Sequence, residues 1–338
     1  MDDEWLDNPI LIYGPRKSGS SLLQNLIDGG NQLLMIPGEL NLNHTFKYLH
    51  FPEAAQKQEY LSRGRSLHRD NHFASKTDTN YEQLMDAVEF QIPPLKKPQL
   101  EGALNSKEYL RVLGKLPTSA FSNMRSIHQY DVKAFRDALH KNKVNYSGWA
   151  SKEVGGACPQ AILTYFKTMF PKSRIVFIAR DPRFIVRSII LNRRRQGITL
   201  PLFQILKEYH EVQRIMDFYY GLEETPDLTF IFYEDLSSNT EAEMKHLAKR
   251  LGIEYSEVLT QPTVLGIETV VTTSSQHTKK VFKNKDSEGT WKKDLSFRET
   301  VAIYLYEYAY SIFRGALGKR RISYAILKDS IKKQRDSF

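Results

Sequence analysis

Cysteine is nearly absent from this chain of 338 residues, because Cys158 is the only one. A single cysteine cannot form a disulfide within the chain, so a reducing compartment suits the protein better than a secreted setting. We interpret Cys158 as a small buried residue rather than as a reactive thiol.

Long hydrophobic runs are also missing. No stretch approaches the roughly 20 consecutive apolar residues that a membrane-spanning helix requires. Residues 1–5 are mostly acidic and precede no apolar segment, so we expect no secretory signal peptide. Internal repeats and low-complexity tracts are absent as well. These absences predict a cytoplasmic protein without a transmembrane segment.

Metal-site and nucleic-acid signatures are missing too. The histidines and carboxylates show no spacing typical of metal ligands, and none of the standard nucleic-acid-binding motifs occurs. The formal charge of +9 still favours anionic partners, which include nucleic acid, a membrane surface, acidic polymers and a phosphorylated nucleotide. The one dense basic run, residues 193–195, lacks the interleaved aromatic residues of a single-strand-binding surface. We therefore predict a metal-independent protein that does not bind nucleic acid.

Short apolar runs typical of buried parallel strands recur along the chain, at residues 9–13, 33–36, 174–179 and 228–233. The first is followed by a glycine turn and then by leucines at helical spacing, and the last two by polar turns and helical patterns. Strands that alternate with helices favour a parallel sheet covered on both faces. The sequence therefore predicts an α/β, three-layer sandwich with a central parallel sheet and a P-loop-like organisation.

Residues 43–148 have a different character, with many charged residues, scattered histidines and tyrosines, and a loop punctuated by prolines at 93–98. We interpret them as a helical insertion that covers the site and binds the acceptor, within a single domain that spans residues 1–338. A helical stretch over residues 184–220 is expected to break near Gly197 and Pro201, and the amphipathic tail over 298–331 to pack as a helix.

A glycine- and serine-rich turn at residues 14–21 lies between the first strand and the first helix. Backbone amides at a helix N-terminus bind phosphate well, and Ser20 and Ser21 can donate further hydrogen bonds. A nucleotide-triphosphate loop would read G-x-x-x-x-G-K-[ST]. Here Ser20 follows Gly19, and Lys17 stands two positions before that glycine. Lys17 is therefore better placed beside a single 5′-phosphate, which counts against an ATPase or a kinase.

A second candidate anion site follows the strand at 174–179. Arg180 comes directly after this strand, and Ser188 lies eight residues later on the next helix. An arginine and a serine in these positions could converge on one phosphate, because the guanidinium offers paired donors. Alternatively, an arginine of residues 180–183 and Asp181 form a pair that only fixes the turn.

These two motifs resemble those of the sulfotransferase superfamily. Its 5′-phosphosulfate loop reads K-[ST]-G-[ST]-[ST], like residues 17–21, and its 3′-phosphate motif has an arginine followed eight residues later by a serine, like Arg180 and Ser188. Residues 233–236 are similar to its Y-E-D-L motif and residues 251–253 to the L-G-I that follows it. Residues 273–275 and 291–293 resemble its C-terminal loop over the nucleotide. The resemblance covers about residues 9–42 and 148–300.

The resemblance implies a single sulfotransferase domain that moves the sulfuryl group of 3′-phosphoadenosine 5′-phosphosulfate (PAPS) to a hydroxyl or an amine acceptor. The product would be adenosine 3′,5′-bisphosphate (PAP). Lys17 would neutralise charge on the bridging oxygen of the leaving nucleotide. The nucleotide-binding residues that the resemblance implies are Arg16, Lys17, Ser18, Gly19, Ser20, Ser21, Arg180, Ser188, Ser274 and Lys292.

The candidate general base is Glu39, which follows the apolar run at 33–36. The carbohydrate and tyrosyl-protein branches of the family carry a base glutamate in a similar place, so the chain is closer to them than to the histidine-base cytosolic branch. His44 is the second candidate. Lys152 resembles a lysine that family members place near the transferring group, although an ordinary surface lysine is the alternative. The acceptor implied is a carbohydrate, a peptide tyrosine or a small metabolite.

Two other interpretations remain. A P-loop kinase of small molecules is weakened by the displaced lysine and by the lack of an obvious magnesium-holding aspartate after a second strand. A non-catalytic binder of nucleotides or nucleic acid is weakened because pure binding would not require Glu39. The sequence does not indicate an oligomeric state.

Overall fold

The computed structural model describes residues 3–40, 42, 95–115, 124–140, 144–155, 159–269, 271–272, 277–278, 290–316 and 324–335. Cys158 and two of the predicted site residues, His44 and Ser274, lie outside the described residues. The predictions made for these three residues therefore stay predictions.

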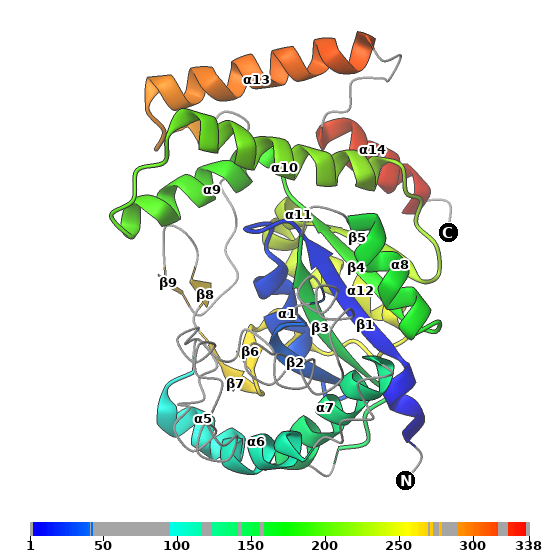
Figure 1. Cartoon of the computed structure of the whole chain (residues 1–338). Helices are drawn as coiled ribbons and strands as arrows, with labels where there is room; N and C mark the ends of the chain where they lie inside the picture. The colour runs from blue at the N-terminus through cyan, green and yellow to red at the C-terminus, as the bar shows by residue number, and fades with distance from the viewer. Residues whose placement is uncertain are drawn as a thin grey trace.

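Five parallel strands form the central sheet, in the order β2-β3-β1-β4-β5 (Figure 1). The strands are β1 (Pro9–Gly14), β2 (Leu33–Glu39), β3 (Gly148–Val154), β4 (Arg174–Ala179) and β5 (Leu228–Phe232). Two antiparallel pairs lie outside this sheet: β6 (Thr263–Val264) with β7 (Ile267–Glu268), and β8 (Val271–Thr272) with β9 (His277–Thr278). Four of the five sheet strands coincide with the predicted apolar runs.

Strand β3 was not predicted, although it lies between β2 and β1. Its sequence includes Ser151, Lys152 and Glu153, which do not resemble the apolar runs of the other strands. All three of these polar side chains are nevertheless buried. The strand therefore brings charged groups into the middle of the sheet, at the end where Gly14 and Glu39 also lie.

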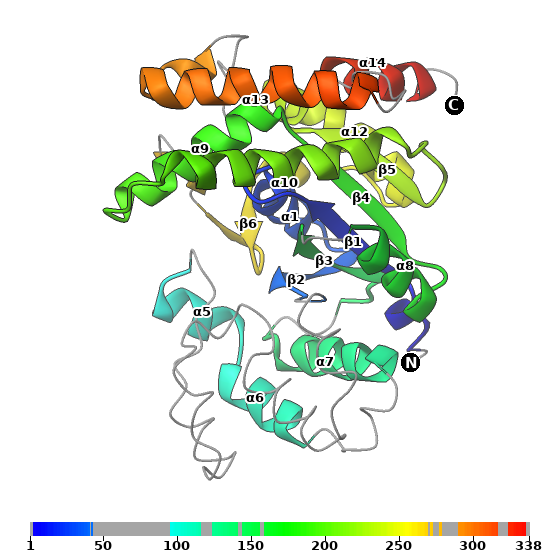
Figure 2. The ribbon, with the colours of Figure 1, turned by 45° about the horizontal axis from the view of Figure 1, so that its top comes forward.

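Helices cover both faces of the sheet, which confirms the predicted three-layer arrangement (Figure 2). On one face, α1 (Ser20–Asp28), α12 (Thr240–Leu251) and the 3₁₀ turn η4 (Glu257–Thr260) pack on the sheet through apolar side chains such as Leu23, Leu247 and Leu259. The opposite face is covered by α7 (Met124–Ala138), α8 (Pro159–Met169), α9 (Pro182–Arg195) and α10 (Leu202–Tyr220).

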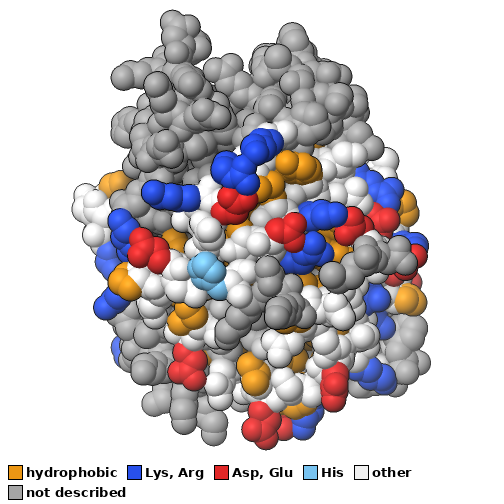
Figure 3. All heavy atoms as spheres, turned by 90° about the horizontal axis from the view of Figure 1, so that it is seen from below, with side chains coloured by type: hydrophobic (Ala, Val, Ile, Leu, Met, Phe, Trp, Pro, Cys, Tyr) orange, Lys and Arg blue, Asp and Glu red, His pale blue; other side chains and the backbone are white. Residues whose placement is uncertain are grey.

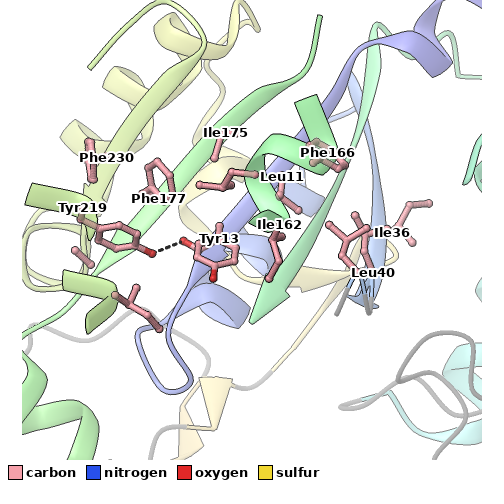
Figure 4. Packing of buried hydrophobic residues seen from close by; sticks show 14 of the residues in the cluster. Leu11, Tyr13, Ile36, Leu40, Ile162, Phe166, Ile175, Phe177, Tyr219 and Phe230 are labelled. Carbon is pink, nitrogen blue, oxygen red and sulfur yellow. Dashed lines mark hydrogen bonds between the residues drawn. The ribbon is translucent and has the colours of Figure 1, made fainter. Parts of the chain in front are cut away.

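The core on this second face is rich in aromatic residues (Figure 4). The rings of Phe177 on β4 and Phe230 on β5 stack with their centroids 5.1 Å apart, and Tyr219 of α10 packs against both. The Tyr219 hydroxyl donates a hydrogen bond to the carbonyl oxygen of Tyr13, 3.2 Å away. Helix α10 is thereby fastened to β1 immediately before the glycine-rich turn.

Helices α9 and α10 are separated near Gly197 and Pro201, as predicted. The carboxylate of Asp181 caps the N-terminus of α9 by accepting a hydrogen bond from the backbone amide of Arg183, 2.9 Å away. Pro201 precedes α10, where its missing N–H costs nothing.

Where the structure describes the predicted insertion at 43–148, helices α5 (Lys97–Ala103), α6 (Ser106–Gly114) and α7 make up most of it, and its last residue, Gly148, begins β3. Helix α7 packs against β2 and the 3₁₀ turn η1 (Asp3–Asp7). The division into one domain with an acceptor-binding insertion stays a prediction. On the face seen from below, basic and acidic side chains of the described residues are interspersed, so they form no patch of one sign there (Figure 3).

The C-terminal part consists of η5 (Thr290–Lys292), α13 (Phe297–Ala316) and α14 (Tyr324–Arg335). Earlier in the chain, the short helix α11 (Tyr233–Ser238) directly follows β5. Helix α13 lies along the outer side of α10, as both ribbon views show (Figures 1 and 2). Within the described residues, no helix combines the length and the apolar character needed to traverse a bilayer.

Candidate functional site

The predicted site residues come together at the carboxyl ends of the sheet strands. Gly14 and Glu39 are the last residues of β1 and β2, Lys152 lies near the end of β3, and Arg180 directly follows β4. Because the strands are parallel, these ends share one edge of the sheet, where ligands of open α/β sheets bind.

The glycine-rich turn wraps into the first turn of α1. Lys17 and Gly19 both adopt positive φ angles, 66° and 104°, which turn the backbone back on itself. No side chain caps α1, so its first amides stay directed toward the turn. The Ser18 hydroxyl is fully buried and has no hydrogen-bond partner among the described residues. The uncapped amides of α1 therefore offer hydrogen bonds that a bound phosphate would accept.

Gly19 also allows a close approach by another part of the site. A Cβ atom at this position would lie 2.3 Å from the Tyr233 ring carbon Cδ2, well inside van der Waals contact. Tyr233 begins α11 directly after β5, so the turn packs against the end of a strand two places away in the sheet. Only glycine satisfies both the backbone conformation and this contact.

Gly19→Ala is expected to raise the Kd for PAP at least about tenfold, because the new methyl group must displace Tyr233 or the phosphate turn. Calorimetric titration with PAP measures this. The matched control is Gly197→Ala, at a positive φ of 76° where an added Cβ meets nothing within 4 Å. It should lower the melting temperature slightly and leave PAP binding unchanged. Equal effects of the two variants would refute the steric argument.

Arg180 connects the two predicted phosphate motifs. One Nη atom of its guanidinium donates a hydrogen bond to the carbonyl oxygen of Lys17, 3.0 Å away. The same guanidinium lies over the Tyr233 ring, 4.1 Å from its centroid. Asp181 pairs with Arg183 at 2.5 Å, so the turn-fixing pair considered above involves Arg183.

Ser188 lies on α9 and is buried, and its hydroxyl has no hydrogen-bond partner among the described residues. Ser18 shows the same feature on the other motif. A buried hydroxyl without a partner costs free energy, about 1–3 kcal/mol in mutational series, unless a ligand completes it. Each of the two predicted phosphate motifs therefore contains one buried hydroxyl without a partner among the described residues, and neither hydroxyl oxygen has surface that a phosphate could contact in this conformation.

Glu39, Lys152 and Ser21 lie in a row beside this turn. The Lys152 ammonium donates to the Ser21 hydroxyl at 2.6 Å and lies 4.0 Å from a carboxylate oxygen of Glu39. Burial lowers the pKa of Lys152, and the nearby Glu39 carboxylate opposes part of that shift. The candidate base Glu39 and the candidate cation Lys152 are thus connected to α1, the helix that follows the phosphate turn.

The end of β2 is held by a side chain that sequence reasoning missed. The buried amide nitrogen of Gln24 on α1 donates to the carbonyl oxygens of Ile36 and Gly38, at 2.8 and 3.1 Å. These bonds hold the strand through its register irregularity between Met35 and Glu39. Glu39 is therefore fixed by α1, the same helix that begins the phosphate turn.

Lys17 lies in a strongly cationic environment. Partial burial, together with the guanidinium groups of Arg195 and Arg16, lowers the pKa of Lys17. Arg16 itself forms an ion pair with Glu208 of α10, at 2.7 Å. An environment with this excess of positive charge favours a multiply charged anion.

Lys292 is placed differently from the other predicted nucleotide-binding residues. Its ammonium lies over the rings of Tyr304 and Trp291, at 4.9 and 5.8 Å from their centroids. Among the contacts of the described residues, none joins it to Lys17 or Arg180. Its predicted role over the nucleotide stays a prediction.

A family model described as "Sulfotransferase family" matches residues 9–257, which is most of the chain. The chain belongs to the sulfotransferase family. No curated protein matches it at a significant level.

Solved structures similar to this sulfotransferase include two sulfotransferase domains and a retinol dehydratase. The sulfotransferase domain of the Synechococcus PCC 7002 olefin synthase is 15% identical, with 87% of this chain and 86% of that chain covered and a TM-score of 0.45. The sulfotransferase domain from the curacin biosynthetic pathway is also 15% identical, with 88% and 96% covered and a TM-score of 0.44. Retinol dehydratase in complex with androsterone and inactive cofactor PAP is 14% identical, with 94% and 83% covered and a TM-score of 0.42.

Two further residues of the candidate site were missed because their partners are distant in the sequence. Tyr233 was noted only as part of a four-residue similarity, yet it contacts both Gly19 and Arg180. Its place at the end of a buried strand was the available signal. Glu153 is buried next to Lys152 and accepts a hydrogen bond from the amide of Leu42 at 2.9 Å, and no local pattern indicates this.

Across the described part of the chain, no three His, Cys, Asp or Glu residues form a group that could hold a metal ion.

Proposed function

We propose that this sulfotransferase takes the sulfuryl group from PAPS and transfers it to a hydroxyl-bearing acceptor, with Glu39 as the general base. The observation that carries the proposal is the row formed by Glu39, Lys152 and Ser21, which lies beside the turn that presents Lys17. A base, two cations and a phosphate-binding turn are the parts that sulfuryl transfer by in-line displacement requires.

The residues of the two motifs fit PAPS. The α1 amides with Ser18, Ser20 and Ser21 would hold its 5′-phosphate, and Arg180 with Ser188 would hold its 3′-phosphate. The uncapped amides of α1 and the place of Arg180 directly after β4 support this assignment, because both offer hydrogen bonds that phosphate oxygens accept. Ser274 and Lys292 are proposed to lie over the nucleotide, as the family resemblance implies.

Bound PAPS supplies an activated sulfuryl group, which leaves the bridging oxygen as the acceptor oxygen bonds to sulfur. The Glu39 carboxylate takes the acceptor's proton. Lys17 neutralises the charge that develops on the leaving nucleotide, and Arg16 adds positive charge nearby. Lys152 orients Glu39 on one side and Ser21 on the other, so that the base and the phosphate turn keep a fixed separation.

The acceptor is proposed to be a carbohydrate, a peptide tyrosine or a small metabolite, since a glutamate base is typical of the carbohydrate and tyrosyl-protein branches. The insertion at 43–148 is proposed to bind it. The sulfuryl group carries less charge than a phosphoryl group, so we propose a metal-independent reaction. The single cysteine supports a cytoplasmic location.

Calorimetric titration with PAP and, separately, with ATP and magnesium tests the donor. We expect the protein to bind PAP about a hundredfold more tightly than ATP, because only PAP satisfies the 3′-phosphate residues. PAP lacks a sulfuryl group, so the result does not depend on the acceptor. A preference for ATP with magnesium would refute the proposal and favour the kinase interpretation.

Incubation with PAPS and a panel of sugars, tyrosyl peptides and phenols then tests the acceptor. Mass spectrometry detects an added sulfuryl group, and PAP release counts turnovers. If the protein binds PAP but sulfates none of these hydroxyl compounds, the proposed acceptor class is refuted, whereas PAPS as the proposed donor is not.

A further inference from the structure

The C-terminal helix α14 holds the beginning of α11 through two carboxylates. The Tyr324 hydroxyl donates a hydrogen bond to one carboxylate oxygen of Glu234. Lys328 donates to Asp235 at 2.6 Å, and Lys332 lies 3.3 Å from the other oxygen of that carboxylate. Helix α14 lies beyond residue 257, where the match to the family model ends.

Glu234 also contacts the predicted 3′-phosphate site, so it connects α14 to that site. Its second carboxylate oxygen accepts a hydrogen bond from the backbone amide of Asp181, 3.2 Å away. Burial raises the pKa of Glu234, and the hydrogen bond from Tyr324, the Asp181 amide and the nearby Arg180 guanidinium oppose that shift. The carboxylate thus contacts the residue that directly follows Arg180 and caps α9.

Tyr233, the residue before Glu234, contacts the same site from the other side. Its ring lies under the Arg180 guanidinium and against Gly19 of the phosphate turn. Two consecutive residues of α11 therefore fix Arg180, one through the backbone after it and one through its side chain. Helix α14 fixes α11.

We propose that Glu234 and Tyr324 are positioning residues for the 3′-phosphate, acting through Arg180. Tyr324 holds the Glu234 carboxylate, and Glu234 holds the turn at Asp181, so that Arg180 keeps the orientation in which it meets the 3′-phosphate. Neither residue touches the nucleotide. The inference rests on the proposed function, because it assumes that Arg180 binds a 3′-phosphate.

The test compares PAP with adenosine 5′-monophosphate (AMP), which lacks only the 3′-phosphate. In Glu234→Gln and Tyr324→Phe, calorimetry should give a Kd for PAP that rises about fivefold to tenfold, because a misaligned arginine loses part of its charge-assisted bonding. The Kd for AMP should change less than about twofold. The change therefore appears in the ratio of the two affinities, which a general loss of stability would not move.

Matched controls are Tyr308→Phe on the exposed side of α13 and Glu241→Gln on the surface of α12. Both should leave the ratio unchanged. An equal loss for PAP and AMP, or an unchanged ratio in Glu234→Gln and Tyr324→Phe, would overturn the positioning role. A wild-type protein that binds PAP no more tightly than AMP would instead remove the 3′-phosphate assignment, and with it the donor proposal.

Discussion

Lys17→Ala is expected to lower the turnover number about a thousandfold, while the Kd for PAP rises less than about tenfold. The reason is that Lys17 is proposed to meet charge that develops only as the sulfuryl group leaves, whereas the nucleotide is held by many other donors. The carbonyl oxygen of Lys17 accepts the hydrogen bond from Arg180, and an alanine keeps that carbonyl. The substitution thus removes the ammonium without removing the link between the two motifs.

PAP release from PAPS, with an acceptor from the panel that the wild-type protein sulfates and with water alone, measures this prediction, and calorimetry with PAP measures binding. Lys17→Arg is the matched control, because it keeps the positive charge at an almost unchanged place. The pKa of Lys17 is lowered, so Lys17 loses its charge at a lower pH than an ordinary lysine does. As the pH rises, wild-type kcat/KM should therefore begin to fall at that lower pH. Arginine stays charged, so the fall should move to higher pH in Lys17→Arg. A normal turnover number in Lys17→Ala would exclude Lys17 from the chemistry.

Glu39→Gln is expected to reduce transfer at least about a thousandfold and to leave the Kd for PAP within about twofold. Glutamine keeps the size of the side chain but cannot take the acceptor's proton. Glu39 lies at the end of β2 and faces Lys152, on the far side of that lysine from the phosphate turn. Nucleotide binding should therefore survive, which separates a missing base from a damaged site.

The same two assays measure the Glu39 prediction, with His44→Ala tested beside it. A variant Glu39→Gln that keeps its turnover number, together with an inactive His44→Ala, would transfer the base role to His44. Glu241→Gln serves as the control for loss of a surface carboxylate. If PAP binding also fails in Glu39→Gln, then Glu39 supports the site through Lys152 and the assignment as base is not supported.

The sequence predicted those parts of the fold that depend on local composition. Four strands are apolar because both of their faces are covered, and their runs are visible without any partner. Strand β3 was not predicted, because its sequence is not an apolar run. Near its end, Lys152 contacts Ser21 and Glu153 contacts Leu42, and these contacts require polar residues. Strand β2 continues past the apolar run through Pro37 and Gly38, where hydrogen bonds from Gln24 and pairing with β3 hold it.

The candidate site, like the fold, could be predicted only in part from the sequence. The phosphate turn and the Arg180 motif could be recognised because each is a short run of residues with fixed spacing. The contacts that join them could not be recognised, because Arg180 and Lys17 are far apart in the sequence, as are Tyr233 and Gly19. Sequence spacing reports which groups are available, whereas the order of the strands decides which groups meet.

The strand order also affects how the protein is made. Strands β1 and β2 are the first to be synthesised, but β3 lies between them, and no pairing within the five-stranded sheet joins two strands that precede residue 148. A nascent chain that ends before residue 148 therefore holds two apolar strands whose partners do not yet exist, and such exposed edges favour aggregation. The sheet can begin to assemble only after β3 has left the ribosome, so Glu39 and Lys152 cannot meet until about half of the chain has been synthesised.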